Sequence, residues 1–304
     1  MAEPPPPTSA NADNDLAGLF ARPFRLTRPA AQNVPFVFAS PHSGRCYPAA
    51  LAAASKLDSL MLRRSEDAFI DELFAGVLEL GAPLLAAEFP RVFLDVNRGM
   101  GELDPAMFAA PLNLAVDPPG PRVVAGLGVI PRIVRDGAEI YRGKLRPEDA
   151  VLRLEKFYRP YHRVLGKLAE ETSGRFGVAV VVDCHSMPSA LGAPDIVLGD
   201  RYGASAAAAL SRLAEASFAR EGFSVGRNAP YAGGHTTALY GRPARGCHAL
   251  QIEVNRGLYL DEDRIVRKES FETVKLRLAA ALTRIVRIAH ADLLPAAGLA
   301  DAAE

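Results

Sequence analysis

Residues 178–182 (VAVVV) form an almost unbroken run of β-branched side chains. A run of this kind, without polar alternation, is typical of a strand in a sheet that is covered on both faces. It therefore predicts a central strand with helices on either side. Other short apolar segments are candidate strands, namely Val34–Ala39, Ala82–Glu88, Arg91–Val96, Asp195–Leu198 and His248–Val254.

Amphipathic segments alternate with these strands. Between Glu148 and Leu168 the apolar residues recur at spacings of 3 and 4, which predicts a helix with one buried face, and Pro160 should kink it. The apolar positions are Val151, Leu154, Tyr158, Tyr161, Leu165 and Leu168. Further helices are expected within residues 57–80, as one or two helices, and over 203–221 and 266–290. The alternation predicts a three-layer α/β fold with a mixed, mostly parallel sheet flanked by helices.

The domain organisation follows from composition at the two ends. The first 15 residues contain four consecutive prolines and almost no apolar bulk, so we expect residues 1–15 to be a disordered tail. Residues 296–304 are predicted to be a second tail. No internal repeat or linker-like stretch interrupts the sequence between them, which favours a single domain over residues 16–295.

Charge and cysteine content restrict the partners and the compartment. Lys plus Arg (35) equals Asp plus Glu (35), which argues against nucleic acid or an anionic membrane as the main partner. No apolar run approaches the roughly 20 residues that a membrane span needs. Three scattered cysteines do not make a disulfide framework, and the N-terminus lacks the pattern of a secretory signal. We therefore expect a cytoplasmic protein.

Histidines and carboxylates follow the predicted strands, where ligands bind in open α/β sheets. His42 comes after the first of them, and His185 after the central one. Strand alternation places Asp183 and His185 on one side, with Cys184 pointing away as an inert buried thiol, and it pairs Gln251 with Glu253 on one face of the late strand. Two histidines and one carboxylate would make a catalytic zinc site with an open position. Each histidine could instead be a hydrogen-bonded structural residue.

The third ligand of such a site could be Asp67 or Glu66, in the segment RRSEDAF. A structural alternative is that Ser65 caps a helix, with Glu66 and Asp67 in its first turn against the helix dipole.

Arginines point to an anionic substrate. Arg98 follows Asn97 at a predicted strand end, Arg142 follows a loop, and Arg256 follows the late strand. Guanidinium groups bind carboxylates in a bidentate manner, although a single surface arginine more often forms a salt bridge. His235, in the glycine-rich segment YAGGHTT, could line a site or merely shape its loop.

Several motifs occur in a specific order, namely PHSG (41–44), EDAFIDELF (66–74), DVNRG (95–99), YRPYH (158–162), DCHSMP (183–188), YAGGHTT (231–237) and ALQIEVNRGLYLDE (249–262). Together they resemble the N-formylglutamate amidohydrolase family, which is similar to zinc carboxypeptidases and to aspartoacylase-type hydrolases. The resemblance implies a zinc-carboxypeptidase-like fold. Position 45, three residues after His42, holds arginine, which cannot bind a metal, so the family pattern favours Asp67 as the carboxylate ligand, with Glu66 as the alternative.

The resemblance also implies a function. Zinc or another divalent metal, one per subunit, would be held by His42, Asp67 and His185, and Glu253 would act as the general base. Asn97, Arg98, Arg256 and His235 would bind the substrate, and Arg142 would bind a second carboxylate or stabilise the oxyanion. The implied reaction is hydrolysis of N-formyl-L-glutamate, or a similar N-acyl amino acid, to formate and the free amino acid, as in histidine degradation. The alternatives are a zinc hydrolase of a different N-acyl amino acid and a non-catalytic binding protein on the same fold.

Overall fold

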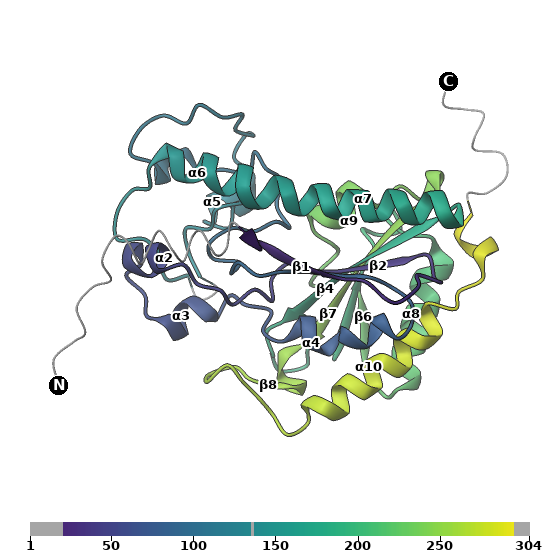
Figure 1. Cartoon of the computed structure of the whole chain (residues 1–304). Helices are drawn as coiled ribbons and strands as arrows, with labels where there is room; N and C mark the ends of the chain where they lie inside the picture. Colours follow the sequence, from purple (N-terminus) through teal and green to yellow (C-terminus); the bar gives the residue numbers. More distant parts are fainter. Residues whose placement is uncertain (1–20, 135–136, 295–304) are drawn as a thin grey trace. The chain divides into compact units, whose positions relative to one another are not determined.

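The computed structural model describes residues 21–134 and 137–294. A seven-stranded sheet runs in the order β1-β3-β2-β4-β7-β5-β6 (Figure 1). Its pairings are parallel between β2 and β3, β2 and β4, β4 and β7, and β5 and β6, whereas β5 runs antiparallel to β7. The strands are β1 (Phe24–Thr27), β2 (Phe36–Ser40), β3 (Leu84–Ala87), β4 (Ala179–Met187), β5 (Ile196–Gly199), β6 (Val225–Arg227) and β7 (Cys247–Asn255). The prediction of a mixed, mostly parallel sheet is confirmed.

The α-helices are α2 (Ala49–Ala54), α3 (Ser59–Arg63), α4 (Ile70–Leu73), α5 (Pro121–Val124), α6 (Pro147–Arg153), α7 (Arg159–Phe176), α8 (Ala208–Arg220), α9 (His235–Tyr240) and α10 (Phe271–Ile285). Short 3₁₀ turns are η1 (Ala75–Leu78), η2 (Pro105–Met107), η4 (Pro243–Arg245), η5 (Arg256–Leu258) and η6 (His290–Leu293), and β8 (Leu260–Asp261) pairs with β9 (Val266–Arg267). None of the helices within the described ranges is long and apolar enough to cross a membrane.

The chain divides into two compact units. Among the described residues, one consists of 21–25, His42–Glu66, 87–134 and 137–162. The other consists of Leu26–Pro41, Asp67–Ala86 and residues 163–294, and it contains most of the sheet. The expected tails at 1–15 and 296–304 lie outside the described residues, and the single domain between them stays a prediction.

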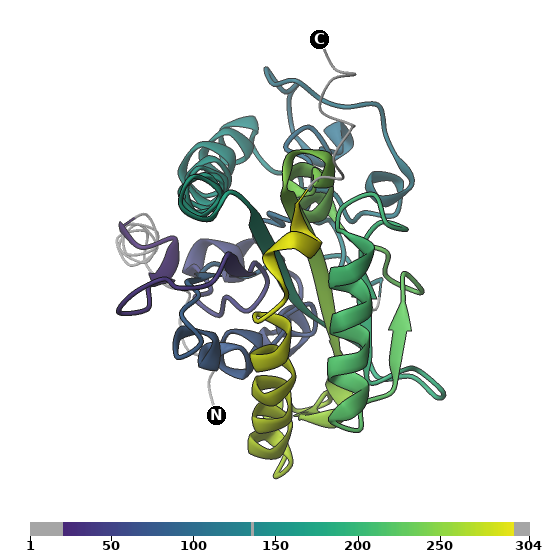
Figure 2. The ribbon, with the colours of Figure 1, turned by 90° about the vertical axis from the view of Figure 1, so that its right-hand side faces the viewer.

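Strands β4 and β7 form the centre of the second unit. Every residue of β4 is buried, so both faces of the strand are covered as the sequence predicts. Val180, Val182 and Cys184 join an apolar cluster with side chains of α4, α8 and α10, which confirms Cys184 as a buried thiol. Burial raises its pKa well above the usual value. Figures 1 and 2 show α10 and α8 side by side on this face of the sheet, and Figure 1 places α9 on the other face.

The other face of these two strands is polar. The register pairs Asp183 with Gln251 and His185 with Glu253, so these four side chains share one face, as alternation requires. In β7 the apolar residues Leu250, Ile252 and Val254 belong to the cluster on the opposite face.

One predicted strand is wrong. Arg91–Val96 forms turns rather than a strand. The carbonyl of Pro90 accepts the N–H of Phe93, and the Asp95 carboxylate accepts the N–H of Asn97. Such local hydrogen bonds compete with the pairing that a strand would need. The predictions for Val34–Ala39, Ala82–Glu88, Asp195–Leu198 and His248–Val254 are confirmed by β2, β3, β5 and β7.

The helix expected over 148–168 contains a feature that the sequence did not predict. A π-helical segment, η3 (Leu154–Tyr158), joins α6 to α7 directly before Pro160. Proline lacks an N–H and its ring clashes with the carbonyl four residues earlier, and a π turn accommodates this defect without ending the helix. Val151 is consequently 40% exposed, although the regular spacing predicted it to be buried.

The other helices are shorter than predicted. Residues 57–80 form α3, α4 and η1, because Phe69 adopts a left-handed conformation (φ 64°) between the two α-helices. Helix α8 begins at Ala208 after Arg201 and Tyr202, which are also left-handed. Helix α10 begins at Phe271, since residues 266–267 form β9.

Gly199 permits a close backbone approach at the end of β5. A Cβ atom there would lie 2.7 Å from the backbone N of Gly233 and 2.8 Å from the backbone C of Ala232. Because backbone atoms cannot rotate away as a side chain can, we expect Gly199→Ala to lower the free energy of unfolding by about 1–3 kcal/mol in urea titrations. The matched control is Gly174→Ala in α7, where a Cβ would meet nothing within 4 Å. This control should stabilise the protein by about 0.5–1 kcal/mol, and equal effects at the two positions would contradict the packing argument.

Candidate metal centre and active site

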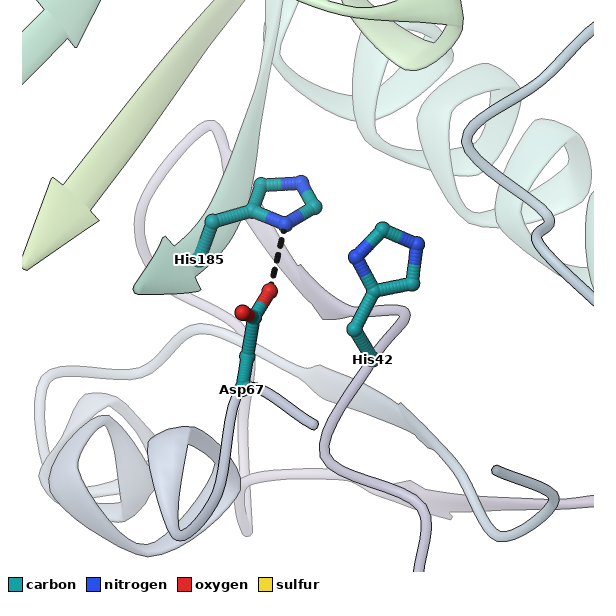
Figure 3. A group of neighbouring side chains, drawn as sticks. All are labelled: His42, Asp67 and His185. Atoms are coloured by element: carbon teal, nitrogen blue, oxygen red, sulfur yellow. Dashed lines mark hydrogen bonds and ion pairs between the residues drawn. The ribbon is translucent and has the colours of Figure 1, made fainter. Parts of the chain in front are cut away.

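His42, Asp67 and His185 are grouped as the sequence predicted. One ligand atom from each lies within 4.8 Å of the others, and all three residues are buried (Figure 3). His42 follows β2 by two residues, His185 lies in the last third of β4, and Asp67 precedes α4. Two imidazoles and one carboxylate at this spacing are a donor set that zinc and similar divalent metals use.

An aspartate holds each histidine ring. His42 Nε2 lies 2.7 Å from Asp95 Oδ1, and His185 Nε2 lies 2.9 Å from Asp183 Oδ2. The opposite ring nitrogen of His185, Nδ1, is 2.9 Å from Asp67 Oδ2, and the corresponding nitrogen of His42 points toward Asp67 and His185 (Figure 3). A carboxylate on one ring nitrogen fixes the tautomer and increases the basicity of the other, which is the usual support of a metal-binding histidine.

The sequence points to only one of these two supporting aspartates. Asp183 was expected on the side of His185 because the two are separated by one residue in a strand. Asp95 belongs to the DVNRG motif, but nothing in its spacing connects it with His42. Its position depends on the turns that replace the predicted strand over 91–96.

Both supporting contacts are electrostatically strong. Burial alone would lower the pKa of His185, but Asp183, Asp67 and Glu253 raise it well above its usual value. Burial alone would raise the pKa of Asp95, but His42, Arg91 and Arg98 hold it well below its usual value.

Arg256 and Ser186 orient the Asp67 carboxylate. Asp67 Oδ1 accepts hydrogen bonds from Arg256 Nη2 at 2.9 Å and from Ser186 Oγ at 3.1 Å. Arg256 Nε also donates to Ser186 Oγ at 2.9 Å. The sequence assigned Arg256 to the substrate, whereas the contacts seen here fix Asp67. Substrate binding by Arg256 stays a prediction.

The neighbouring Glu66 carboxylate is engaged elsewhere. It accepts from Arg63 Nε at 2.9 Å, Arg63 Nη2 at 3.1 Å and the Tyr47 hydroxyl at 2.8 Å. The capping alternative is not observed either, since α4 begins after Phe69 and Asp58, not Ser65, caps α3. Of the two carboxylates that the sequence left open, the geometry favours Asp67 as a ligand.

Glu253 lies on β7, opposite His185, and is 5% exposed. Its Oε1 accepts a hydrogen bond from Gln251 Nε2 at 2.7 Å, and Gln251 Oε1 accepts the backbone N–H of Gly234 at 2.8 Å. The next residue, His235, begins α9 and is half-buried. A buried carboxylate beside a metal-type donor group is suited to proton transfer.

The predicted arginines lie in different environments. Arg98 is buried, donates to the carbonyls of Leu127 and Asn97 at 3.0 Å, and has a lowered pKa, chiefly because of burial. Asn97 is buried beside it. Arg142 is exposed, and its backbone N–H donates to the Ala54 carbonyl. The roles predicted for these residues and for His235 stay predictions.

The charges of the polar cluster fit a cation. Three buried carboxylates, Asp67, Asp183 and Glu253, share the region with one buried guanidinium, Arg256. Buried charges are costly unless they are compensated, and a divalent ion between the donor atoms would offset the excess negative charge. The residues present therefore fit the metal that the donor geometry suggests.

The sheet brings two histidines, Asp67 and the buried Glu253 to one region, an arrangement that fits an α/β hydrolase. The comparisons with known proteins show that the bond such an enzyme cleaves is an amide. The chain belongs to the N-formylglutamate amidohydrolase family, whose profile matches residues 34–260.

Individual relatives support this assignment to the family. An N-formylglutamate deformylase of Pseudomonas aeruginosa is 31% identical over 239 residues, which cover 75% of this chain and 83% of the relative. The crystal structure of an N-formylglutamate amidohydrolase from Ralstonia eutropha JMP134 is 36% identical, with a TM-score of 0.82, covering 87% of this chain and 97% of the other. A protein from Agrobacterium tumefaciens, 19% identical with a TM-score of 0.60 over 88% of this chain and 95% of the other, shares the fold.

The adjacent carboxylates Glu66 and Asp67 provide a matched test of ligation. We expect Asp67→Asn to lose bound metal, because the amide carries no charge and cannot replace the carboxylate as a ligand. Glu66→Gln should retain the wild-type metal content, since its contacts are to Arg63 and Tyr47. Zinc content after dialysis, measured by atomic absorption, decides the matter. Loss of metal only in Glu66→Gln would exchange the two assignments.

The raised pKa of His185 predicts a pH dependence of the metal-free protein. The folded state binds this proton more tightly than the unfolded chain, whose histidine pKa is about 6.5. The resulting stabilisation is complete below about pH 6.5 and is lost as the pH rises through the higher folded-state pKa. We expect the melting temperature of chelator-treated protein to fall as the pH rises above about 6.5, and His185→Gln to remove part of this fall. An identical pH profile in the variant would show that His185 is not the group responsible.

Proposed function

We propose that this protein hydrolyses N-formyl-L-glutamate to formate and L-glutamate. The named activities of the Pseudomonas and Ralstonia relatives support this substrate. The observation that carries the reaction is the pairing of β4 with β7, which sets the buried Glu253 opposite His185 of the His42–Asp67–His185 group. A protein that only bound its ligand would have no need of a buried carboxylate at this point.

The metal centre supplies the electrophile in this proposal. We propose that His42, Asp67 and His185 hold one divalent ion, with zinc the metal best suited to two imidazoles and a carboxylate. When bound, such an ion polarises the formyl oxygen and makes a water molecule more acidic. The contacts of Asp95 and Asp183 orient the two rings for this role, and Arg256 orients Asp67.

Glu253 performs the proton transfers. Its carboxylate removes a proton from the attacking water and then delivers that proton to the departing amine nitrogen of the amino acid. The nitrogen leaves as an amine rather than as an unstable anion, and Glu253 returns to its ionised form. Its burial excludes bulk water that would otherwise compete for the proton.

The charge of the substrate is recognised by arginine. We propose that Arg98, with Asn97, binds one substrate carboxylate. Arg98 is buried, donates to two backbone carbonyls and lies 4.0 Å from the Asp95 carboxylate, which also contacts His42 and Arg91. Arg142, His235 and Arg256 complete the binding groups of the proposal, with Arg142 placed at the second carboxylate or at the developing oxyanion.

The decisive experiment is a panel of N-acyl amino acids assayed with metal-free and zinc-loaded protein. N-formyl-L-glutamate, N-acetyl-L-glutamate, N-formyl-L-glutamine and N-succinyl-L-glutamate vary the acyl group and the side-chain charge separately. We expect formate and free amine to be released fastest from N-formyl-L-glutamate by the zinc-loaded protein. Faster turnover of a larger acyl group would assign the enzyme to another N-acyl amino acid, and no turnover of any would favour a binding protein.

Removal of the base should abolish most of the turnover while leaving the metal in place. We expect Glu253→Gln to lower kcat by about 10²- to 10⁴-fold, the usual contribution of a general base. The control is Glu215→Gln in α8, a glutamate 44% exposed and 3.9 Å from Arg227, which should keep wild-type kcat. Near-normal activity of Glu253→Gln at full metal content would remove Glu253 from the mechanism.

A further inference from the structure

We propose that Gln251 is a positioning residue that fixes the carboxylate of Glu253 for catalysis. This inference rests on the proposed function, in which Glu253 transfers the proton. Gln251 and Glu253 lie two residues apart on the same face of β7, and they are only 4% and 5% exposed. No role beyond its place on this face follows from the sequence.

The orientation of the Gln251 amide is determined by its neighbours. A backbone N–H can only donate, so the group that receives the Gly234 N–H at 2.8 Å must be the amide oxygen. The amide NH₂ therefore faces the other way and donates to Glu253 Oε1 at 2.7 Å. The direction of both hydrogen bonds is therefore fixed: Gly234 donates to Gln251, and Gln251 donates to Glu253.

The backbone of Gly234 is itself fixed by two hydrogen bonds. Its N–H donates to Gln251, and its carbonyl accepts from the buried Thr237 hydroxyl at 2.8 Å. The preceding Gly233 adopts a φ of 118°, a region that favours glycine, and it packs against Gly199 of β5. Gln251 is thus anchored on backbone that the sheet and α9 keep in place.

A fixed anchor matters because a glutamate side chain has three rotatable bonds. A hydrogen bond to one carboxylate oxygen restricts the rotation of the carboxylate before the substrate binds. Loss of this restraint should reduce the fraction of molecules in which the base faces the attacking water. The effect belongs to the chemical step, so it should appear in kcat rather than in KM.

Two substitutions remove the restraint in different ways. Gln251→Glu keeps the size and the acceptor for the Gly234 N–H but replaces the donor by a carboxylate oxygen, which repels Glu253. Gln251→Leu removes both hydrogen bonds with an apolar side chain of similar size, and it decides the question if Gln251→Glu does not fold. For both we expect kcat to fall about 10²-fold, the scale of a misplaced catalytic group, with KM and zinc content unchanged.

The matched control is the other glutamine of the chain, since Gln32 and Gln251 are the only two. Gln32 Nε2 donates to the carbonyls of Val34 and Phe36 and to the Thr172 hydroxyl. Gln32→Glu should therefore lower the melting temperature and leave kcat per folded molecule unchanged. A purely structural role of Gln251 would give this same pattern and would overturn the proposal, as would wild-type kcat in both Gln251 variants.

Crystal structures give a readout that does not depend on activity. In the Gln251→Leu protein we expect the Glu253 carboxylate to be displaced or to occupy more than one rotamer, with the Gly234 backbone unmoved. A single unchanged carboxylate position would refute the inference. If the wild-type protein released no amine from any substrate of the panel, the proposed function would fail, and these crystal structures would still decide the role of Gln251.

Discussion

The parallel pairing of β4 with β7 is the constraint on which the rest of the arrangement depends. Because side chains alternate along a strand, this one register decides that Asp183, His185, Gln251 and Glu253 share a face while valine, leucine and isoleucine side chains fill the opposite face. A shift by one residue in either strand would bury the carboxylates among the helices of the apolar face. The apolar cluster and the polar site therefore favour the same register of β4 and β7, and a shifted register would disrupt both.

The polar face is tolerable only because its charges are organised. Asp95 and Asp183 each contact one nitrogen of a histidine ring. Arg256 donates a hydrogen bond to Asp67, and Gln251 donates one to Glu253. Each of these contacts removes the penalty of an isolated buried polar group and at the same time fixes an orientation. The same hydrogen bonds therefore make the site both stable in a buried setting and rigid enough for chemistry.

The sequence predicts well what depends on local periodicity. The sides of the strands on which His185, Glu253 and Cys184 lie follow from alternation, and the end of a strand just before His42 follows from a run of apolar residues. The expectation that His185 follows the central strand is wrong, because β4 continues to Met187 and includes it. The sequence does not predict contacts that depend on how distant turns pack. The carboxylate of Asp95 reaches His42 from a segment that looked like a strand, and Arg256 reaches Asp67 across 189 positions of sequence. Ser65 had the chemistry of a helix cap, but the left-handed Phe69 moved the start of α4 past it.

The π-helical turn before Pro160 has a consequence for how related chains can vary. A π turn amounts to one extra residue in a helix, and one residue corresponds to a rotation of about 100° around the axis. The π turn absorbs this residue, so that Ala150 and Arg153 face inward, whereas a continuous α-helix of the same length would turn Val151 inward instead. A relative that lacks both the π turn and this residue would keep the same side of the helix inward. Alignments of this helix should accordingly admit a single-residue gap at 154–158, even though no loop is there to absorb it.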